Sequence, residues 1–123
     1  MESFIGSEVT FNSDIAQDII THKVGGAIIF SSKMHANIQG PAQLQSLTST
    51  IKQISSNYTG YPFLFSVDEE GWQVARLRKS NGFVKIGNYA HTLECGRIIG
   101  KMLSDMRLDI YIDLYDEPRA WTE

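Results

Sequence analysis

The sequence predicts an α/β fold in which about four parallel strands are joined by three crossover helices. Ala27–Phe30 is a continuous apolar run without alternation, which is typical of a parallel strand buried on both faces. Strand-like and helix-like segments alternate along the chain, and each crossover is long enough to connect parallel neighbours. This pattern fits either a small open parallel sheet or part of a (β/α)8 barrel.

The first two segments are a short strand and a helix. Residues 3–9 are expected to form the strand. The helix starts after the N-cap candidates Asn12 and Ser13 and ends near His22 and Lys23, where cations suit the helix dipole. Its apolar face is formed by Ile15, Ile19 and Ile20.

The central segment repeats this order. After Ala27–Phe30, residues 31–40 form a polar loop, and Pro41 marks the start of a second helix. Apolar residues spaced three and four apart make this helix amphipathic: Leu44, Leu47, Ile51 and Ile54. Residues 63–67 predict the third strand, with alternate residues on opposite faces. One face carries Phe63, Phe65 and Val67, and the other carries Leu64, Ser66 and Asp68.

The last segments are a third helix and a fourth strand. A long loop, residues 69–91, precedes the helix, which Thr92 is expected to cap. The helix has a buried stripe of Ile98, Ile99, Met102, Leu103 and Met106. Gly96 and Gly100 lie four apart on it and predict close packing against the sheet. Residues 108–114 alternate strictly and predict the fourth strand.

Composition narrows the class of protein. The 123 residues suit one domain, residues 1–123, with a modest core. The net charge is −3, and the interspersed charges do not form the basic stripe that nucleic acid requires. The single Cys95 is expected to be a buried free thiol. No leader or membrane-spanning run is evident, so a cytoplasmic location is expected.

The stretch SVDEEGWQVARLR, residues 66–78, places polar residues directly after the third strand. Ligands gather at the C-terminal ends of parallel strands in both candidate architectures, and Asp68 lies at such an end. Glu69 is expected to be exposed. The histidines, His22, His35 and His91, show no metal-ligand spacing, so no metal site is predicted. No other cofactor is expected.

The same stretch carries a family resemblance. KVGGAIIF (23–30), QLQSLTSTIKQ (43–53) and FLFSVDEEGWQVARLR (63–78) resemble, in this order, the β-N-acetylglucosaminidase (β-N-acetylhexosaminidase) type of glycoside hydrolase family 3. The resemblance runs from about Phe4 to Asp116. That family has a strand ending in Asp-x-Glu-Gly-Gly-Arg-Val-x-Arg. The resemblance implies a partial (β/α)8 TIM-like barrel, corresponding to the N-terminal half of the family's catalytic domain.

The resemblance also implies part of a sugar site. Asp68 matches the motif's Asp, which hydrogen-bonds hydroxyls of the sugar in the −1 subsite, and Arg76 matches the final Arg, which supports the same sugar. Glu70 matches the motif's Glu and is expected to brace the loop. Trp72 and Gln73 depart from the family's Gly and Arg. Trp72 is expected either to stack on a sugar ring or to fill an apolar gap.

The catalytic residues of the family are implied to lie elsewhere. Retaining glycosidases use a nucleophilic carboxylate and a separate acid/base. In this family both lie downstream of the matched region, so no catalytic residue is assigned and the chain alone is expected to be inactive. Asp113, within the predicted fourth strand, and Asp116, just after it, are further pocket candidates. An unrelated activity using Asp68 with one of them is a minor alternative.

Two partner expectations follow. The implied ligand is a sugar of the N-acetylglucosamine type, in a truncated relative of a carbohydrate-metabolising hydrolase. The alternative function is a non-catalytic α/β binding or interaction module derived from that family. Four parallel strands leave two open sheet edges, which invite pairing, so self-association is expected.

Overall fold

The computed structural model of the protein describes residues 1–69, 75–83 and 93–112, with the backbone alone for residues 95, 111 and 112. The described elements alternate between strand and helix, as the sequence predicts. In chain order they are β1 (Glu2–Ser3), α1 (Asp14–His22), β2 (Gly26–Ile29), α2 (Pro41–Thr59), β3 (Leu64–Asp68), the short 3-10 helix η1 (Lys79–Asn81), α3 (Leu93–Asp105) and β4 (Ile110–Ile112).

The four strands form one parallel sheet in the order β1-β2-β3-β4. The central pair has Gly26 opposite Leu64 and Ile29 opposite Val67. The predicted α/β class with about four parallel strands is therefore confirmed. Spatial order follows chain order without a reversal, whereas a doubly wound open sheet reverses at a switch point. The observed order is that of consecutive strands in a (β/α)8 barrel.

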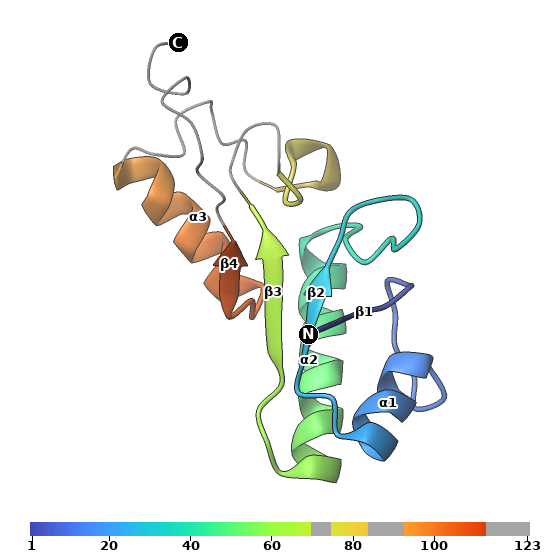
Figure 1. Ribbon diagram of the computed structural model, residues 1–123. Coiled ribbons are helices and arrows are strands. Elements are labelled where there is room, and N and C mark those ends of the chain that lie inside the picture. Colours follow the sequence, from blue (N-terminus) through green and yellow to red (C-terminus); the bar gives the residue numbers. More distant parts are fainter. Residues whose placement is uncertain (70–74, 84–92, 113–123) are drawn as a thin grey trace.

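The core lies between the sheet and its helices. Figure 1 shows α2 running alongside β2 and β3, with α1 beside α2. From the sheet, Phe63, Phe65 and Val67 are fully buried on the face predicted from their alternation. From α2, the predicted stripe supplies Leu44, Leu47 and Ile51, with Ile54 partly buried. Burying each of these large side chains contributes about 2 kcal/mol.

A polar contact joins α2 to the start of β3 and to the residue that precedes β4. The Lys52 ammonium donates to the Phe63 carbonyl oxygen at 2.8 Å and pairs with Asp109 Oδ2 at 2.6 Å. The same Asp109 oxygen accepts the backbone N–H of Phe65 at 2.9 Å. Asp109 therefore fixes where the β3–β4 pairing starts. The register that follows places Asp68 opposite Ile112 at the C-terminal ends of the two strands.

The structure corrects three details of the sequence prediction. The first strand is Glu2–Ser3, shorter and earlier than residues 3–9, and the last is Ile110–Ile112, within the predicted 108–114. Close packing at Gly96 and Gly100 was wrong: both are exposed, and a Cβ added at either would meet nothing within 4 Å. The burial predicted for the Cys95 side chain and the cap predicted at Thr92 lie outside the described residues.

Candidate functional site

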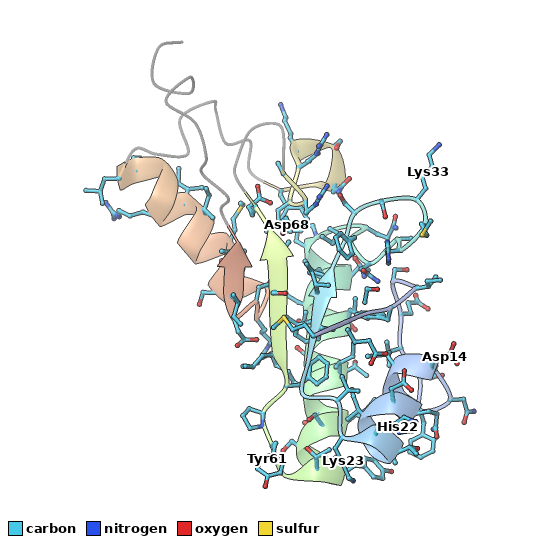
Figure 2. All side chains as sticks on the ribbon, in the orientation of Figure 1. Asp14, His22, Lys23, Lys33, Tyr61 and Asp68 are labelled. Carbon is cyan, nitrogen blue, oxygen red and sulfur yellow. The ribbon has the colours of Figure 1, made fainter. Side chains whose placement is uncertain are left out.

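Asp68 is the last residue of β3 and lies at the C-terminal edge of the sheet, as predicted. Its neighbour across the sheet is Ile112, the last residue of β4. Figure 2 shows Asp68 at the tip of the β3 arrow, at the end of the sheet opposite to His22, Lys23 and Tyr61. The parallel arrangement therefore places this carboxylate where ligands gather in folds of this class.

Arg76 lies beside Asp68. One guanidinium nitrogen, Nη2, is 3.6 Å from Asp68 Oδ2, and the two side chains are 27% and 29% exposed. This distance allows electrostatic attraction but exceeds that of a good charge-assisted hydrogen bond, about 2.8 Å. The carboxylate oxygens therefore keep capacity to accept hydrogen bonds from a ligand that approaches the exposed side.

The guanidinium of Arg76 also lies over an aromatic ring. Its central carbon is 5.9 Å from the centroid of Phe30, which follows β2 directly. The Phe30 ring in turn packs against the ring of His35, with centroids 4.7 Å apart. Arg76 Nε is buried and has no hydrogen-bond partner within the part of the chain that the structure describes. The guanidinium thus lies between the residue that follows β2 and the last residue of β3.

Glu69 is buried, so the predicted exposure of this residue was wrong. Its side chain is 1% exposed, and Oε2 accepts the backbone N–H groups of Arg76 and Leu77, each at 2.9 Å. Glu69 follows the last residue of β3, and its carboxylate faces the backbone of the segment that returns at Arg76 and Leu77. A buried carboxylate is stable only when it is paired or hydrogen-bonded, and the two backbone donors meet this requirement.

A second buried polar group shapes the loop after β2. Asn37 is fully buried; its Nδ2 donates to the carbonyl oxygens of Phe4 at 3.1 Å and Gly6 at 2.9 Å. Its Oδ1 accepts the backbone N–H of Phe30 at 2.9 Å. Asn37 thereby ties the segment after β1 to the end of β2 and fixes the backbone that carries the Phe30 ring beneath Arg76.

The remaining predicted site residues lie outside the described ranges. These are Glu70, Trp72, Asp113 and Asp116, together with the departure at Gln73. Within the ranges 1–69, 75–83 and 93–112 there is no group of three or more His, Cys, Asp or Glu side chains that could hold a metal ion. Among the helices of these described ranges, none is long and apolar enough to cross a membrane.

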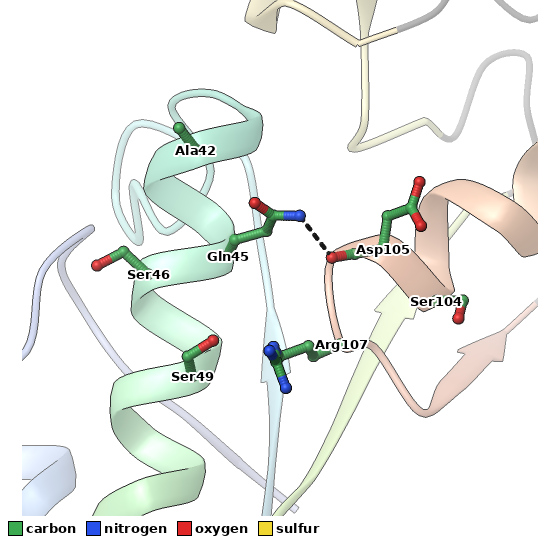
Figure 3. Close-up of a pocket in the computed structure, with 7 residues that line it drawn as sticks. All are labelled: Ala42, Gln45, Ser46, Ser49, Ser104, Asp105 and Arg107. Atoms are coloured by element: carbon green, nitrogen blue, oxygen red, sulfur yellow. Dashed lines mark hydrogen bonds between the residues drawn. The ribbon is translucent and has the colours of Figure 1, made fainter.

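A separate hollow lies on the helical side of the sheet, between α2 and the turn that leads from α3 to β4 (Figure 3). Its volume is about 450 Å³. The lining residues are Ala42, Gln45, Ser46, Ser49, Ser104, Asp105 and Arg107. Gln45 Nε2 bridges it by donating to the Asp105 carbonyl oxygen at 2.8 Å. This hollow shares no residue with the Asp68 site and carries none of the predicted sugar-binding residues.

Two residues of the site were missed by the sequence reasoning. Phe30 closes the predicted apolar run, and the rule that strand ends gather ligands could have placed it beside Asp68. Glu69 gave no such signal, because a carboxylate after a strand is usually solvated, and only the return of the chain at Arg76 makes its burial possible.

Comparisons with known proteins relate the chain to one group of enzymes. No family model matches the sequence. It is 24% identical over 113 residues to "Beta-hexosaminidase A" of Pseudoalteromonas piscicida, covering 82% of this chain and 18% of that protein. It is 39% identical over 71 residues to a "Beta-hexosaminidase" of Pseudomonas aeruginosa strain LESB58, covering 57% of this chain and 18% of that protein.

Solved structures agree with these sequence matches. A glycoside hydrolase family 3 β-N-acetylglucosaminidase from Paenibacillus sp. str. FPU-7 superposes with a TM-score of 0.75 and 30% identity, over 91% of this chain and 22% of that one. A fungal multi-domain β-N-acetylglucosaminidase of the same family gives 0.68 and 29%, over 87% and 13%. The chain therefore spans about a fifth of the length of the curated relatives it matches.

Proposed function

Since the chain is related to the N-terminal region of family 3 glycoside hydrolases of the β-N-acetylglucosaminidase type, we propose that it carries part of their −1 sugar subsite. The four strands correspond, in this proposal, to consecutive strands of a (β/α)8 barrel. The ligand is a sugar of the N-acetylglucosamine type. The single observation that carries the proposal is the Asp68–Arg76 pair at the C-terminal edge of the sheet.

The chemistry of this pair suits sugar hydroxyls. A carboxylate has two oxygens and can accept two hydroxyl hydrogen bonds, and charge-assisted bonds are about twice as strong as neutral ones. Arg76 offers donors to a ring or acetamido oxygen on the same side. Both side chains are about three-tenths exposed, so a ligand can reach them without unfolding the site.

The proposed activity is binding without turnover. The residues that support the sugar subsite do not include a pair of carboxylates in the roles of nucleophile and acid/base, which a retaining glycosidase requires. We expect no hydrolysis of a chromogenic β-N-acetylglucosaminide above the buffer rate. Turnover that disappears in Asp68→Asn would instead assign catalysis to this carboxylate and overturn the proposal.

Calorimetric titration with N-acetylglucosamine tests the binding itself. The wild-type chain is expected to bind weakly, and Asp68→Ala is expected to reduce the affinity at least ~10-fold because it removes two charged hydrogen bonds. Asp105→Ala is the matched control, since this aspartate is half exposed and pairs only with Lys101 on its own helix among the described side chains. Binding that is equal in Asp68→Ala and Asp105→Ala would exclude Asp68 from the site.

The second candidate function is a non-catalytic interaction module. The Asp68 side chain is 29% exposed, and the sequence replaces the family's Gly and Arg by Trp72 and Gln73. The absence of any N-acetylglucosamine binding by a folded wild-type chain would favour this module over the sugar subsite. The single cysteine suits a reducing compartment, so we place either form of the protein in the cytoplasm.

We further propose that two copies of the chain associate through the open edges of the sheet. Leu64 and Ile110 lie on the face that this pairing would enclose and are 42% and 41% exposed, and Met1 is 65% exposed. Two copies would supply eight strands, the number that closes a barrel of this type, and β4 of each copy would meet β1 of the other. Sedimentation at micromolar concentration is expected to show a dimer that Leu64→Lys dissociates. A wild-type monomer would refute the association.

A further inference from the structure

We infer that Glu69 is a positioning residue for the proposed sugar subsite, because its carboxylate holds the backbone of Arg76 so that the guanidinium stays beside Asp68. This inference rests on the proposed function, because the subsite that Glu69 would support is the proposed sugar subsite. The contacts themselves are properties of the folded chain without a ligand. Glu69 reaches Arg76 through the backbone N–H of that residue, and we place its effect on the subsite in this contact.

The first observation is the pair of hydrogen bonds by which Glu69 holds the backbone of Arg76 and Leu77, here called the clamp. Glu69 Oε2 accepts the N–H groups of Arg76 and Leu77, both at 2.9 Å, across seven and eight residues of chain. Its side chain is 1% exposed, so water does not compete for these hydrogen bonds. One oxygen of the carboxylate that directly follows β3 therefore fixes two consecutive peptide groups, those of Arg76 and Leu77.

The second observation is that Arg76 is not held by its own side-chain hydrogen bonds. Among residues 1–69, 75–83 and 93–112, the buried Arg76 Nε finds no hydrogen-bond partner, and Asp68 Oδ2 lies 3.6 Å from Nη2. A buried donor without a partner costs free energy, so this placement persists only where the surroundings impose it. The surroundings impose the position of the Arg76 backbone, because Glu69 binds the Arg76 amide.

The third observation is the anchoring of the clamped segment on both sides of Arg76. Leu77 is 2% exposed within the core. Asn81 Nδ2 donates to the Arg76 carbonyl oxygen at 3.4 Å. With its amide bound by Glu69 and its carbonyl by Asn81, the backbone of Arg76 is held where its side chain reaches over the Phe30 ring. The subsite is thus formed before a ligand arrives, which lowers the entropic cost of binding.

The test uses single and double variants with readouts that do not need a sugar. Glu69→Ala removes the clamp, Arg76→Ala removes the guanidinium, and the double variant measures whether the two act together. Glu94→Gln is the control, since the Glu94 side chain is 73% exposed. Exchange of the Arg76 and Leu77 amide hydrogens and the Arg76 Nε–H signal are followed by NMR, and N-acetylglucosamine affinity is followed by calorimetry.

We expect Glu69→Ala to speed exchange of both amides ~10- to 100-fold and to broaden or shift the Arg76 Nε–H signal. Sugar affinity is expected to fall ~10-fold in Glu69→Ala and to fall no further in the double variant than in Arg76→Ala alone. Glu69→Gln, which keeps one acceptor oxygen, is expected to show intermediate values. If Glu69→Ala does not fold, this conservative variant takes its place in every comparison.

Each outcome decides one of the two claims. Unchanged amide exchange and an unchanged Nε–H signal in the folded Glu69 variants would overturn the positioning role, whatever the measured affinity for N-acetylglucosamine. Independent losses in Glu69→Ala and Arg76→Ala, multiplying to ~100-fold in the double variant, would also overturn it, since Glu69 would then act by another route. If the wild type binds no sugar, the proposed function fails, and the NMR measurements alone decide the role of Glu69.

Discussion

Asp109 offers the sharpest test of how the start of the β3–β4 pairing is held in place. Its Oδ2 accepts the Phe65 N–H at 2.9 Å and pairs with Lys52 at 2.6 Å, with about a third of its side chain exposed. Losing a hydrogen bond to a charged acceptor costs about 1.5 kcal/mol, and losing a partly exposed ion pair costs about 0.5 kcal/mol. Asp109→Ala should therefore reduce the free energy of unfolding by about 2 kcal/mol.

Urea unfolding followed by circular dichroism measures this loss. For a chain of this length, about 2 kcal/mol corresponds to a fall in Tm of roughly 7 °C. Asp109→Asn keeps an acceptor for the Phe65 N–H and removes the charge, so it should cost only about 0.5 kcal/mol. Asp105→Ala is the control, because the Lys101–Asp105 pair is largely exposed. Equal losses for Asp109→Ala and Asp105→Ala would refute the reasoning.

Two further predictions concern other parts of the sheet. Gly26→Ala should destabilise the fold by about 1–3 kcal/mol, because its Cβ would lie 2.9 Å from the Leu64 carbonyl oxygen, whereas Gly25→Ala should be nearly neutral in the same urea titration. A hydrogen bond that the protonated Glu2 carboxyl donates to Asp18 raises the pKa of Glu2 above its ordinary 4.5, with burial and the Asp18 charge adding to this. The folded state therefore binds this proton more tightly than the unfolded state, so the stabilisation is complete below pH 4.5 and is lost as pH rises through the folded pKa. Glu2→Gln should flatten this part of the stability profile; a stability that still falls over the same pH range would contradict the assignment.

The order and type of the elements could be predicted because they depend on local patterns. The stripe of α2 and the alternation around Phe65 report which faces are buried, and Pro41 marks a helix start for steric reasons. The ends of strands are less predictable, because they depend on where a partner strand begins. β1 keeps only Glu2–Ser3, since only those residues find partners on β2.

The candidate site was predictable in part for the same reason. Asp68 follows from strand alternation and from the rule that ligands gather at strand ends, and its proximity to Arg76 was expected only through a family motif. The burial of Glu69 could not be read from the sequence, because it depends on two amides that return from seven and eight residues away. Gly96 and Gly100 failed as a packing signal because their spacing does not reveal which side of α3 faces the sheet.

The order β1-β2-β3-β4 has a consequence for partial unfolding of the domain. Each strand exchanges hydrogen bonds only with the strands before and after it in the chain, so cooperativity passes from neighbour to neighbour, much as in repeat proteins. An outer strand can fray while the unit of β2, α2 and β3 keeps its ladder and its buried aromatic residues. Native-state hydrogen exchange should therefore be slowest in β3. Local opening of β4 should expose Asp68 from one side without global unfolding of the domain.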